Sequence, residues 1–436
     1  MANQKRDLLD DLIDIQSDWQ ALSNPFGDIA DSLAADPSQR KVFDPADYKE
    51  KPFANSNRCL CTASGRDDVC TRCLDVCPVN AIEIHKQSVI IGDDCRKCGL
   101  CAAACPTETI STRRHMPRQV YDKIARAASA YEHCYVTCTR ALKRLPKDNE
   151  IVLGCVGAIS RDLWFSLMAD YDNISVYLPV GICDRCKTTT GEEFYCDAIG
   201  TAEEWAQASL DLVADESEMT HDFTREYKRS QFMSSAVHSA ERLLTRTNPA
   251  LAGAKAVANK ISAHASRLDQ LQRTLEGAVG AKTSNNRQRM LTQNRKLVMG
   301  ALQHDEGLAK FIDLTVPVCD ASKCTMCGDC AKVCTTRALD LDVNGHITIQ
   351  SSYCVSCGAC VKVCEDGALA MEPMDVTELI VPDPAAEELA RKKAQAKAEA
   401  QKYIEQGKKQ LSRAADVLEG LGTSDSGAND SKTSKK

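Results

Sequence analysis

Residues 324–334 read CTMCGDCAKVC, and residues 354–364 read CVSCGACVKVC. Residues 95–105 repeat the same spacing as CRKCGLCAAAC. In each stretch three cysteines lie three positions apart, and a fourth follows four positions later. A glycine comes directly after the second cysteine each time, at Gly99, Gly328 and Gly358, and it allows the backbone to turn tightly at that point. These stretches contain half of the 24 cysteines of the 436-residue chain, so they dominate its chemistry.

The spacing suits a cubane iron–sulfur cluster. Three thiolates at intervals of three residues can wrap one loop around three corners of a 4Fe–4S cluster, while the fourth cysteine faces away and reaches a second cluster. Zinc instead favours two C-x2-C pairs held apart, which together supply four tetrahedral ligands. Because the triplet with an outlying fourth cysteine occurs in tandem between Cys324 and Cys364, the sequence predicts iron–sulfur clusters there.

A fourth stretch departs from this pattern. Residues 70–78 read CTRCLDVCP, and Asp67 stands where the first cysteine would be. The missing ligand must come from upstream, and both Cys59 and Cys61 qualify by chain length. The alternative is a cluster with three protein ligands and a labile iron.

Hairpin-like stretches separate the cysteine motifs. Residues 81–84 (AIEI) precede residues 88–91 (SVII), and residues 338–341 (ALDL) precede residues 346–349 (HITI). The second pair turns at Asn-Gly, a strong hairpin signal. This organisation resembles the bacterial two-cluster ferredoxins over about residues 58–110 and 318–371. The resemblance implies two dicluster domains, four 4Fe–4S clusters and a multi-cluster, polyferredoxin-like electron-transfer protein.

The resemblance also implies that ligands cross over between neighbouring motifs. The implied sets are Cys324, Cys327 and Cys330 with Cys364; Cys354, Cys357 and Cys360 with Cys334; Cys95, Cys98 and Cys101 with Cys77; and Cys70 and Cys73 with Cys105 and either Cys59 or Cys61. The Arg-Cys-Leu context of residues 58–60 is similar to that of related iron–sulfur proteins and favours Cys59.

Between the motifs, residues 118–214 alternate helical and strand patterns. The predicted strands are Cys134–Cys138, Glu150–Leu153 and Ile174–Leu178, and the predicted helices are Gln119–Tyr131, Ser160–Tyr171 and Thr201–Leu212. Such alternation indicates a small α/β unit with a parallel sheet, whose carboxyl edge collects ligand-binding loops.

Four cysteines are expected at that edge. Cys138 and Cys155 end the first two strands, and Cys183 and Cys186 follow the third. They are candidates for one further 2Fe–2S, 4Fe–4S or zinc centre. The alternatives are a redox-active Cys183/Cys186 dithiol or inert buried thiols. We expect Cys134, Cys196 and Cys319 to be structural, because no partner for them is evident in the sequence.

The fold class predicted is multidomain α+β, with two dicluster ferredoxin-like domains flanking a small α/β domain and a helical segment. The predicted segments are an acidic N-terminal segment with a short amphipathic helix (1–57), a dicluster domain (58–117), the α/β domain (118–215), a helical spacer (216–312), a second dicluster domain (313–375), and a polar helix with a disordered tail (376–436).

Composition excludes several other classes. The net charge of −7 argues against a nucleic-acid partner, since such binding needs cationic side chains. No stretch approaches the ~18 apolar residues of a membrane span, and the N-terminus lacks a signal-peptide pattern. We therefore expect a cytoplasmic protein without direct membrane insertion, in a reducing compartment where clustered cysteines bind metal and do not form disulfides. Nucleotide-binding glycine motifs are absent from the sequence.

These observations favour an electron carrier or electron-transfer subunit and not an enzyme. Its expected partner is a redox enzyme or another electron-transfer protein. The alternatives are an iron–sulfur subunit of an oxidoreductase complex with redox chemistry at the middle-domain cysteines, and an iron–sulfur assembly or redox-sensing protein.

Overall fold

A computed structural model describes residues 42–225, 227 and 250–381 of the chain. The predicted N-terminal helix, the polar helix after residue 385 and the tail lie outside these residues. The described residues up to Val381 belong to one compact unit. The segment boundaries given above stay predictions.

The N-terminal dicluster segment is built from short elements around its cysteines. After a 3-10 turn, η2 (Pro45–Tyr48), come β1 (Phe53–Ala54), η3 (Ser56–Arg58), α3 (Leu60–Ser64), α4 (Arg72–Asp75), β2 (Ile82–Ile84), β3 (Val89–Ile91), α5 (Leu100–Ala104) and β4 (Ile110–Ser111). Strands β2 and β3 form an antiparallel hairpin, and β1 pairs antiparallel with β4. The hairpin predicted between the two motifs is thus confirmed.

The C-terminal dicluster segment repeats this plan. Its elements are β9 (Thr315–Cys319), α12 (Asp329–Val333), β10 (Leu339–Leu341), β11 (Ile347–Ile349), η7 (Ser351–Tyr353), α13 (Ala359–Lys362), β12 (Leu369–Pro373) and η8 (Val376–Leu379). Strands β10 and β11 form the second predicted hairpin, which turns through Gly345 at φ +85°. Strand β9 pairs antiparallel with β12, so the two ends of the segment close against each other.

A parallel sheet lies between these segments in the sequence. Its strands are β5 (Cys134–Cys138), β6 (Glu150–Leu153), β7 (Ile174–Tyr177) and β8 (Asp211–Val213), in the order β6-β5-β7-β8. All three strand pairings are parallel. Helices α6 (Pro117–Ala130), α7 (Arg161–Asp170) and α8 (Gly191–Ala206) accompany the sheet, as do η4 (Val156–Ala158) and η5 (Glu216–Glu218).

The third predicted helix of this region was misplaced. Helix α8 begins at Gly191, ten residues before the predicted start, and the predicted end of the helix is instead strand β8. Ala198, Ala202 and Trp205 are the buried face of α8 and follow helical spacing. The helix ends where Gln207 takes a left-handed conformation, at φ +51°.

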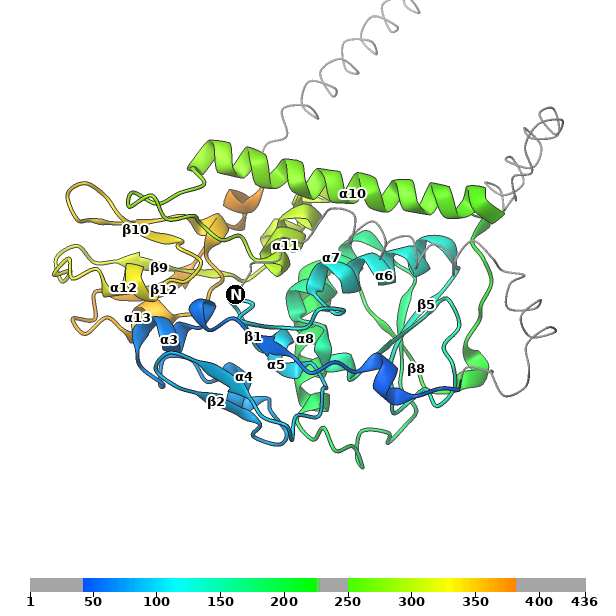
Figure 1. Cartoon of the computed structure of the whole chain (residues 1–436). Helices are drawn as coiled ribbons and strands as arrows, with labels where there is room; N and C mark the ends of the chain where they lie inside the picture. The colour runs from blue at the N-terminus through cyan, green and yellow to red at the C-terminus, as the bar shows by residue number, and fades with distance from the viewer. Residues whose placement is uncertain (1–41, 226, 228–249, 382–436) are drawn as a thin grey trace, which may run out of the picture. The chain divides into compact units, whose positions relative to one another are not determined.

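Two helices cover one side of this unit. The long α10 (Ala250–Val279) contacts α6 and α11 (Gln293–His304), which is followed by η6 (Glu306–Phe311) (Figure 1). Leu268, Leu271 and Leu275 of α10 are buried and follow helical spacing, within the segment predicted to be a helical spacer. A Cβ at Gly300 of α11 would press on a methyl of Leu268, so glycine at this position favours close packing of the two helices.

The two dicluster segments pack against each other although about 200 residues of sequence separate them. Helix α3 contacts α12, and the blue and yellow parts of the chain lie side by side in Figure 1. Leu60 and Val69 of the first segment share one buried apolar cluster with Val333, Leu339 and Val363 of the second. This packing brings the two sets of cysteine motifs together.

Candidate metal centres

The cysteine loops repeat an unusual backbone conformation. The residues just before the second cysteine of the three complete motifs, Lys97, Met326 and Ser356, have φ of +56°, +57° and +52°, and the glycines just after it, Gly99, Gly328 and Gly358, have φ of +87°, +76° and +74°. Non-glycine residues rarely adopt such angles, so a requirement of the loop must impose them. A loop that wraps tightly around a single bound group would impose these angles.

The same agreement holds beyond the last cysteine of each motif. Three residues after it, Asn80, Glu108, Arg337 and Gly367 all have φ between +50° and +60°. The incomplete first motif shares this turn but not the wrapped loop, because Thr71 has φ −115° where the others have glycine. The turn after the last cysteine is therefore repeated in all four motifs, whereas the wrapped loop is repeated only in the three complete motifs.

Main-chain N–H groups point at the cysteine sulfurs. The amides of Lys97 and Met326 donate to the Sγ of Cys95 and Cys324, two residues earlier, at 3.4 Å each. In the turns after the motifs, main-chain amides also donate to the Sγ of the last cysteine, at N–Sγ distances of 3.2–3.3 Å. These hydrogen bonds run from Ala81 to Cys77, from Thr109 to Cys105 and from Ala368 to Cys364. Such donors stabilise negative charge on cysteine-ligated metal sites.

Four of the predicted ligands surround one cavity of about 350 Å³. Cys59, Cys70, Cys73 and Cys105 line it together with apolar side chains that include Leu60. This is the crossed arrangement, because Cys105 comes from the second motif and the others from the first and its upstream loop. A second cavity of about 320 Å³ is lined by four cysteines in the same way: Cys324, Cys327, Cys330 and Cys364.

The other two predicted sets also converge. The pKa of Cys98 is raised by burial and then by the neighbouring sulfurs of Cys95 and Cys77. For Cys357, burial raises the pKa to about 12, and the sulfurs of Cys334 and Cys354 act in the same direction. Each set therefore joins cysteines of both motifs in its segment.

These buried thiols fit a cofactor that brings positively charged iron to the sulfurs. Burial, followed by neighbouring sulfurs, raises the pKa of Cys73 to about 12. Alone, such a thiol would stay protonated at neutral pH, whereas a metal ligand must be the thiolate. The positive charge of iron at the sulfurs supplies the missing stabilisation.

The structure distinguishes the two upstream candidates. Cys59 precedes α3 and faces the cavity, whereas Cys61 does not line it, and its Sγ donates to the carbonyl of Cys70 at 3.2 Å. The neighbouring Cys61 side chain lowers the pKa of Cys59. Cys59 thus lies where it could serve as the fourth ligand of this set, whereas Cys61 lies beside it outside the cavity lining.

The remaining cysteines fall into two groups. Cys138, Cys155, Cys183 and Cys186 gather at the carboxyl edge of the sheet, and their arrangement is described below. Cys134 is fully buried and donates to the carbonyl of Ile124, which suits a structural thiol. Cys196 is exposed on α8, so the expectation of a buried structural cysteine is wrong there. Cys319 lies beside Cys324, a neighbour of the site that the motif spacing did not reveal.

Arg295 is a further neighbour that sequence reasoning missed. It lies on α11 with only 3% of its surface exposed, and its Nη2 donates to the carbonyl of Cys354 at 2.6 Å. Burial lowers its pKa. No sequence motif indicates this contact, because the hydrogen bond joins Arg295 to a residue 59 positions away.

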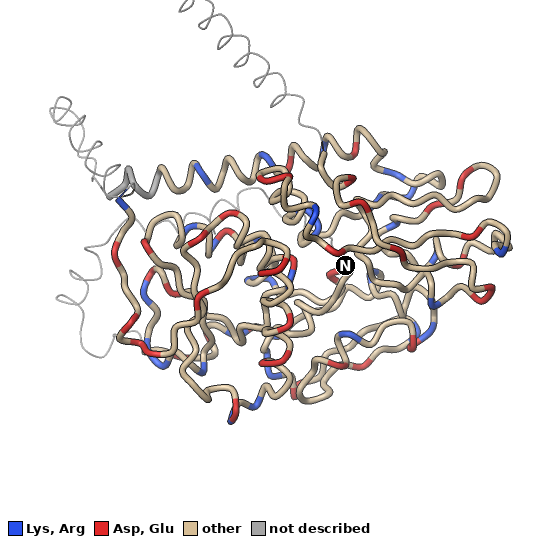
Figure 2. The backbone as a smooth tube through the Cα atoms, turned by 180° about the vertical axis from the view of Figure 1, so that it is seen from behind, with Lys and Arg blue, Asp and Glu red and all other residues tan. Residues whose placement is uncertain are grey.

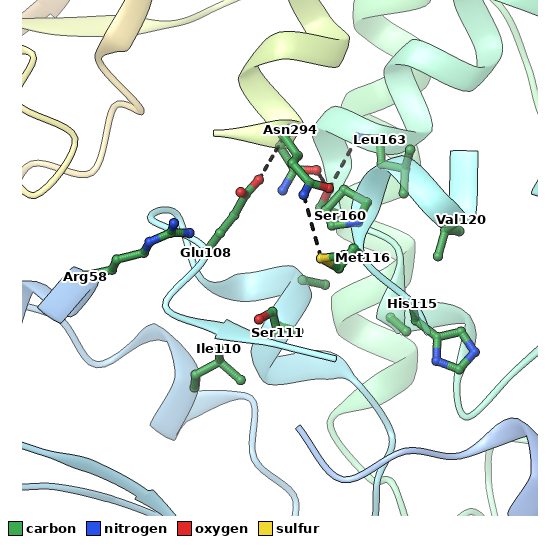
Figure 3. A pocket seen from close by; sticks show the side chains of 15 residues that line it. Arg58, Glu108, Ile110, Ser111, His115, Met116, Val120, Ser160, Leu163 and Asn294 are labelled. Carbon is green, nitrogen blue, oxygen red and sulfur yellow. Dashed lines mark hydrogen bonds between the residues drawn. The ribbon is translucent and has the colours of Figure 1, made fainter. Parts of the chain in front are cut away.

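A pocket of about 550 Å³ lies where the first dicluster segment meets α6, α7 and α11, and Figure 3 shows its lining. There Glu108 accepts from the amide of Asn294 at 2.9 Å, and Ser160 Oγ lies 2.9 Å from Asn294 Oδ1. Burial raises the pKa of Glu108. These contacts fasten the turn after Cys105 to the start of α11, so we assign this pocket a structural role.

Within residues 42–225, 227 and 250–381, no three metal-ligating side chains lie as close as the ligands of one ion would. Nor does any helix in this part of the chain have the length and apolar character needed to cross a membrane.

Comparison with known proteins agrees with this geometry. The family model for the 4Fe-4S dicluster domain matches residues 66–109 and 323–368. The chain is 35% identical over 46 residues to a ferredoxin of Methanothermococcus thermolithotrophicus, covering 10% of this chain and 77% of that protein. It is 37% identical over 43 residues to an uncharacterized ferredoxin of Methanocaldococcus jannaschii, covering 9% and 69%. No solved structure matches the chain.

These findings define an iron–sulfur protein with two 4Fe–4S dicluster domains, as the motifs predicted. The chain belongs to the ferredoxin family, and electron transfer through iron–sulfur clusters follows from that membership.

Proposed function

We propose that this chain is an electron-transfer protein that holds four 4Fe–4S clusters and relays electrons to or from a redox enzyme or another electron-transfer protein. The observation that carries the proposal is the crossing of cysteines between motifs. It surrounds two cavities with four cysteines each and gathers the other two sets in the same way. The ligand sets are those given above, with Cys59 completing the set of Cys70, Cys73 and Cys105.

A 4Fe–4S cluster accepts and releases single electrons at a potential set by its surroundings. The chain supplies three things to such a site: thiolates at the corners, apolar walls that keep water away, and main-chain N–H groups that offset the added negative charge. All three are present around Cys324, where the Met326 amide donates to sulfur and Ile347 and Leu369 line the cavity.

The contact between the two dicluster segments supports a single relay. Arg72 lines the cavity of Cys70 and Cys73 in the first segment, and its charge also acts on Cys357 in the second. A cation between two anionic centres favours an electron on either of them. Acidic and basic residues are interspersed along the described chain (Figure 2), so charge alone does not select a docking face.

Anaerobic purification of the full chain tests the proposal. We expect about sixteen irons per chain, four per cluster, with matching acid-labile sulfide and electron paramagnetic resonance signals after reduction with dithionite. The reduced protein should then pass electrons to an artificial acceptor without turning over a substrate. Colourless protein without absorption near about 400 nm or labile sulfide would contradict the proposal.

A further inference from the structure

Four cysteines outside the dicluster segments meet at the carboxyl edge of the parallel sheet. Cys138 is the last residue of β5 and pairs in register with Leu153 of β6, two residues before Cys155. The loop that carries Cys183 and Cys186 follows β7, the other neighbour of β5. Because the three strands are parallel and adjacent, their carboxyl ends bring all four cysteines to one place.

The four sulfurs act on one another. Burial raises the pKa of Cys155 to about 12, and the sulfurs of Cys138, Cys98 and Cys186 contribute in the same direction. Burial raises the pKa of Cys183, and the sulfurs of Cys138 and Cys186 contribute in the same direction. Cys98 is a predicted ligand of the first dicluster segment, so this group lies next to an expected cluster.

Three of these sulfurs, those of Cys138, Cys155 and Cys186, also share the hydrogen-bonding pattern of the predicted cluster ligands. The amide of Thr188 donates to Cys186 Sγ at 3.5 Å, with the same two-residue offset as Lys97 and Cys95. Main-chain N–H groups two residues on also face Cys138 and Cys155, from Arg140 and Gly157. Cys134, in the same strand as Cys138, instead donates its S–H to a carbonyl. Only sulfurs that carry negative charge gain from this pattern.

The surrounding loops touch the first dicluster segment on two sides. A Cβ at Gly154 would lie 2.6 Å from the carbonyl oxygen of Lys97, so the two backbones meet directly. Across the site, Thr190 Oγ1 donates to the carbonyl of Val76 at 2.7 Å, one residue before Cys77. A Cβ at Gly191 would lie 3.0 Å from Cys155 Sγ, so a larger residue there would crowd that sulfur.

We propose that Cys138, Cys155, Cys183 and Cys186 hold a fifth iron–sulfur centre that exchanges single electrons with the cluster of Cys77, Cys95, Cys98 and Cys101. The inference rests on the proposed function, because it needs that cluster as its redox partner. Zinc fits the place less well, since it has no redox chemistry to share with the neighbouring cluster. A Cys183/Cys186 dithiol would leave Cys138 and Cys155, with their amide donors, unexplained.

The metal content of the full-length protein, purified without oxygen, tests the inference. We expect the wild-type chain to hold roughly two to four irons beyond the sixteen of the dicluster domains. The double variant Cys183→Ala/Cys186→Ala should lose that surplus and one paramagnetic resonance signal, and keep the signals of the other clusters. The control Cys196→Ala, which changes an exposed cysteine on α8, should keep all of its iron.

Several results would overturn the inference. A wild-type chain with about sixteen irons and no surplus would do so without any variant, as would zinc in place of the surplus iron. Equal iron in the double variant and the wild type would do so too. Should the double variant not fold, Cys138→Ser with the same measurements replaces it. The proposed function would fail differently, because the chain would then lack the sixteen irons as well.

Discussion

Arg295 places a buried positive charge against the loop that begins at Cys354. Its Nη2 donates to the Cys354 carbonyl, and Nε and Nη1 have no hydrogen-bond partner within the described residues. Asp162 is the carboxylate that acts on it, with the Cys354 sulfur next. A buried cation held this way costs desolvation energy, which an anionic cluster nearby would offset.

Arg295→Met should therefore make the cluster of the Cys354 loop harder to reduce. One unit charge at about 10 Å and an effective dielectric constant of about 20 contributes roughly 1.7 kcal/mol, or about 70 mV for one electron. We expect one of the cluster potentials to fall by tens of millivolts in a redox titration followed by paramagnetic resonance.

Lys296→Met is the matched control, since the next residue on the helix pairs with Asp269 at 2.8 Å. Its removal should leave the cluster potentials unchanged. If both variants shifted the same potential equally, the contact with Cys354 would not be the cause.

Cys59 and Cys61 permit a second test at the scale of single residues. Cys59 faces the cavity with Cys70 and Cys73, whereas Cys61 donates to a carbonyl. Cys59→Ala should leave one cluster with three cysteine ligands and a labile iron, lowering iron content by about one per chain and adding a three-iron resonance signal after oxidation. Cys61→Ala should keep the iron content of the wild type; the reverse result would exchange the two roles.

Motif spacing predicts the ligands that lie within a few residues of one another. It could not choose between Cys59 and Cys61, because the choice depends on which of these two side chains at the start of α3 faces the cavity. Motif spacing did not reveal the positions of Arg295 and Cys319 beside these cysteines, for a related reason. Their roles come from tertiary contacts with Cys354 and Cys324, and neither belongs to a repeated local pattern.

At the scale of elements, the cysteine loops depend on glycine to different degrees. A Cβ at Gly99 would lie 2.7 Å from the Cβ of Ala158, at the contact with the sheet unit. A Cβ at Gly358 would meet nothing within 4 Å in the described structure. Both residues have positive φ, at +87° and +74°.

Gly99→Ala should therefore destabilise the protein more than Gly358→Ala. The left-handed backbone costs about 1–2 kcal/mol for alanine at either position, and overpacking at Gly99 adds roughly 1–3 kcal/mol. We expect Gly99→Ala to lose its cluster absorbance at a lower urea concentration than Gly358→Ala, with both below the wild type. Equal midpoints for the two variants would argue against a tight contact at Ala158.

The strands of the sheet could be predicted from sequence, but helix α8 could not be placed correctly. Strands β5, β6 and β7 are short apolar runs, and each lies within one residue of its predicted range. Two glycines, Gly191 at the start of α8 and Gly200 in its interior, weaken the helical pattern. The short strand β8 is largely exposed, and parallel pairing with β7, not an apolar pattern, defines it.

At the scale of the whole molecule, the sequence predicted two dicluster domains but not their contact. Leu60, Val69 and Val333 look like internal core residues of their own segments. In the structure they share one buried cluster across the two segments. Such packing depends on the shapes of both surfaces, which hydrophobic patterns within either segment do not encode.

This contact predicts that electrons pass between the two dicluster domains within one molecule. Helix α3 touches α12, and Arg72 lies near centres of both domains. After a pulse that delivers about one electron per chain, the distribution of the electron among the clusters should relax at a rate that stays constant on tenfold dilution. Transfer that requires collision between molecules would instead slow in proportion to protein concentration. A rate that falls tenfold would show that the packing of α3 on α12 does not join the two domains into one relay.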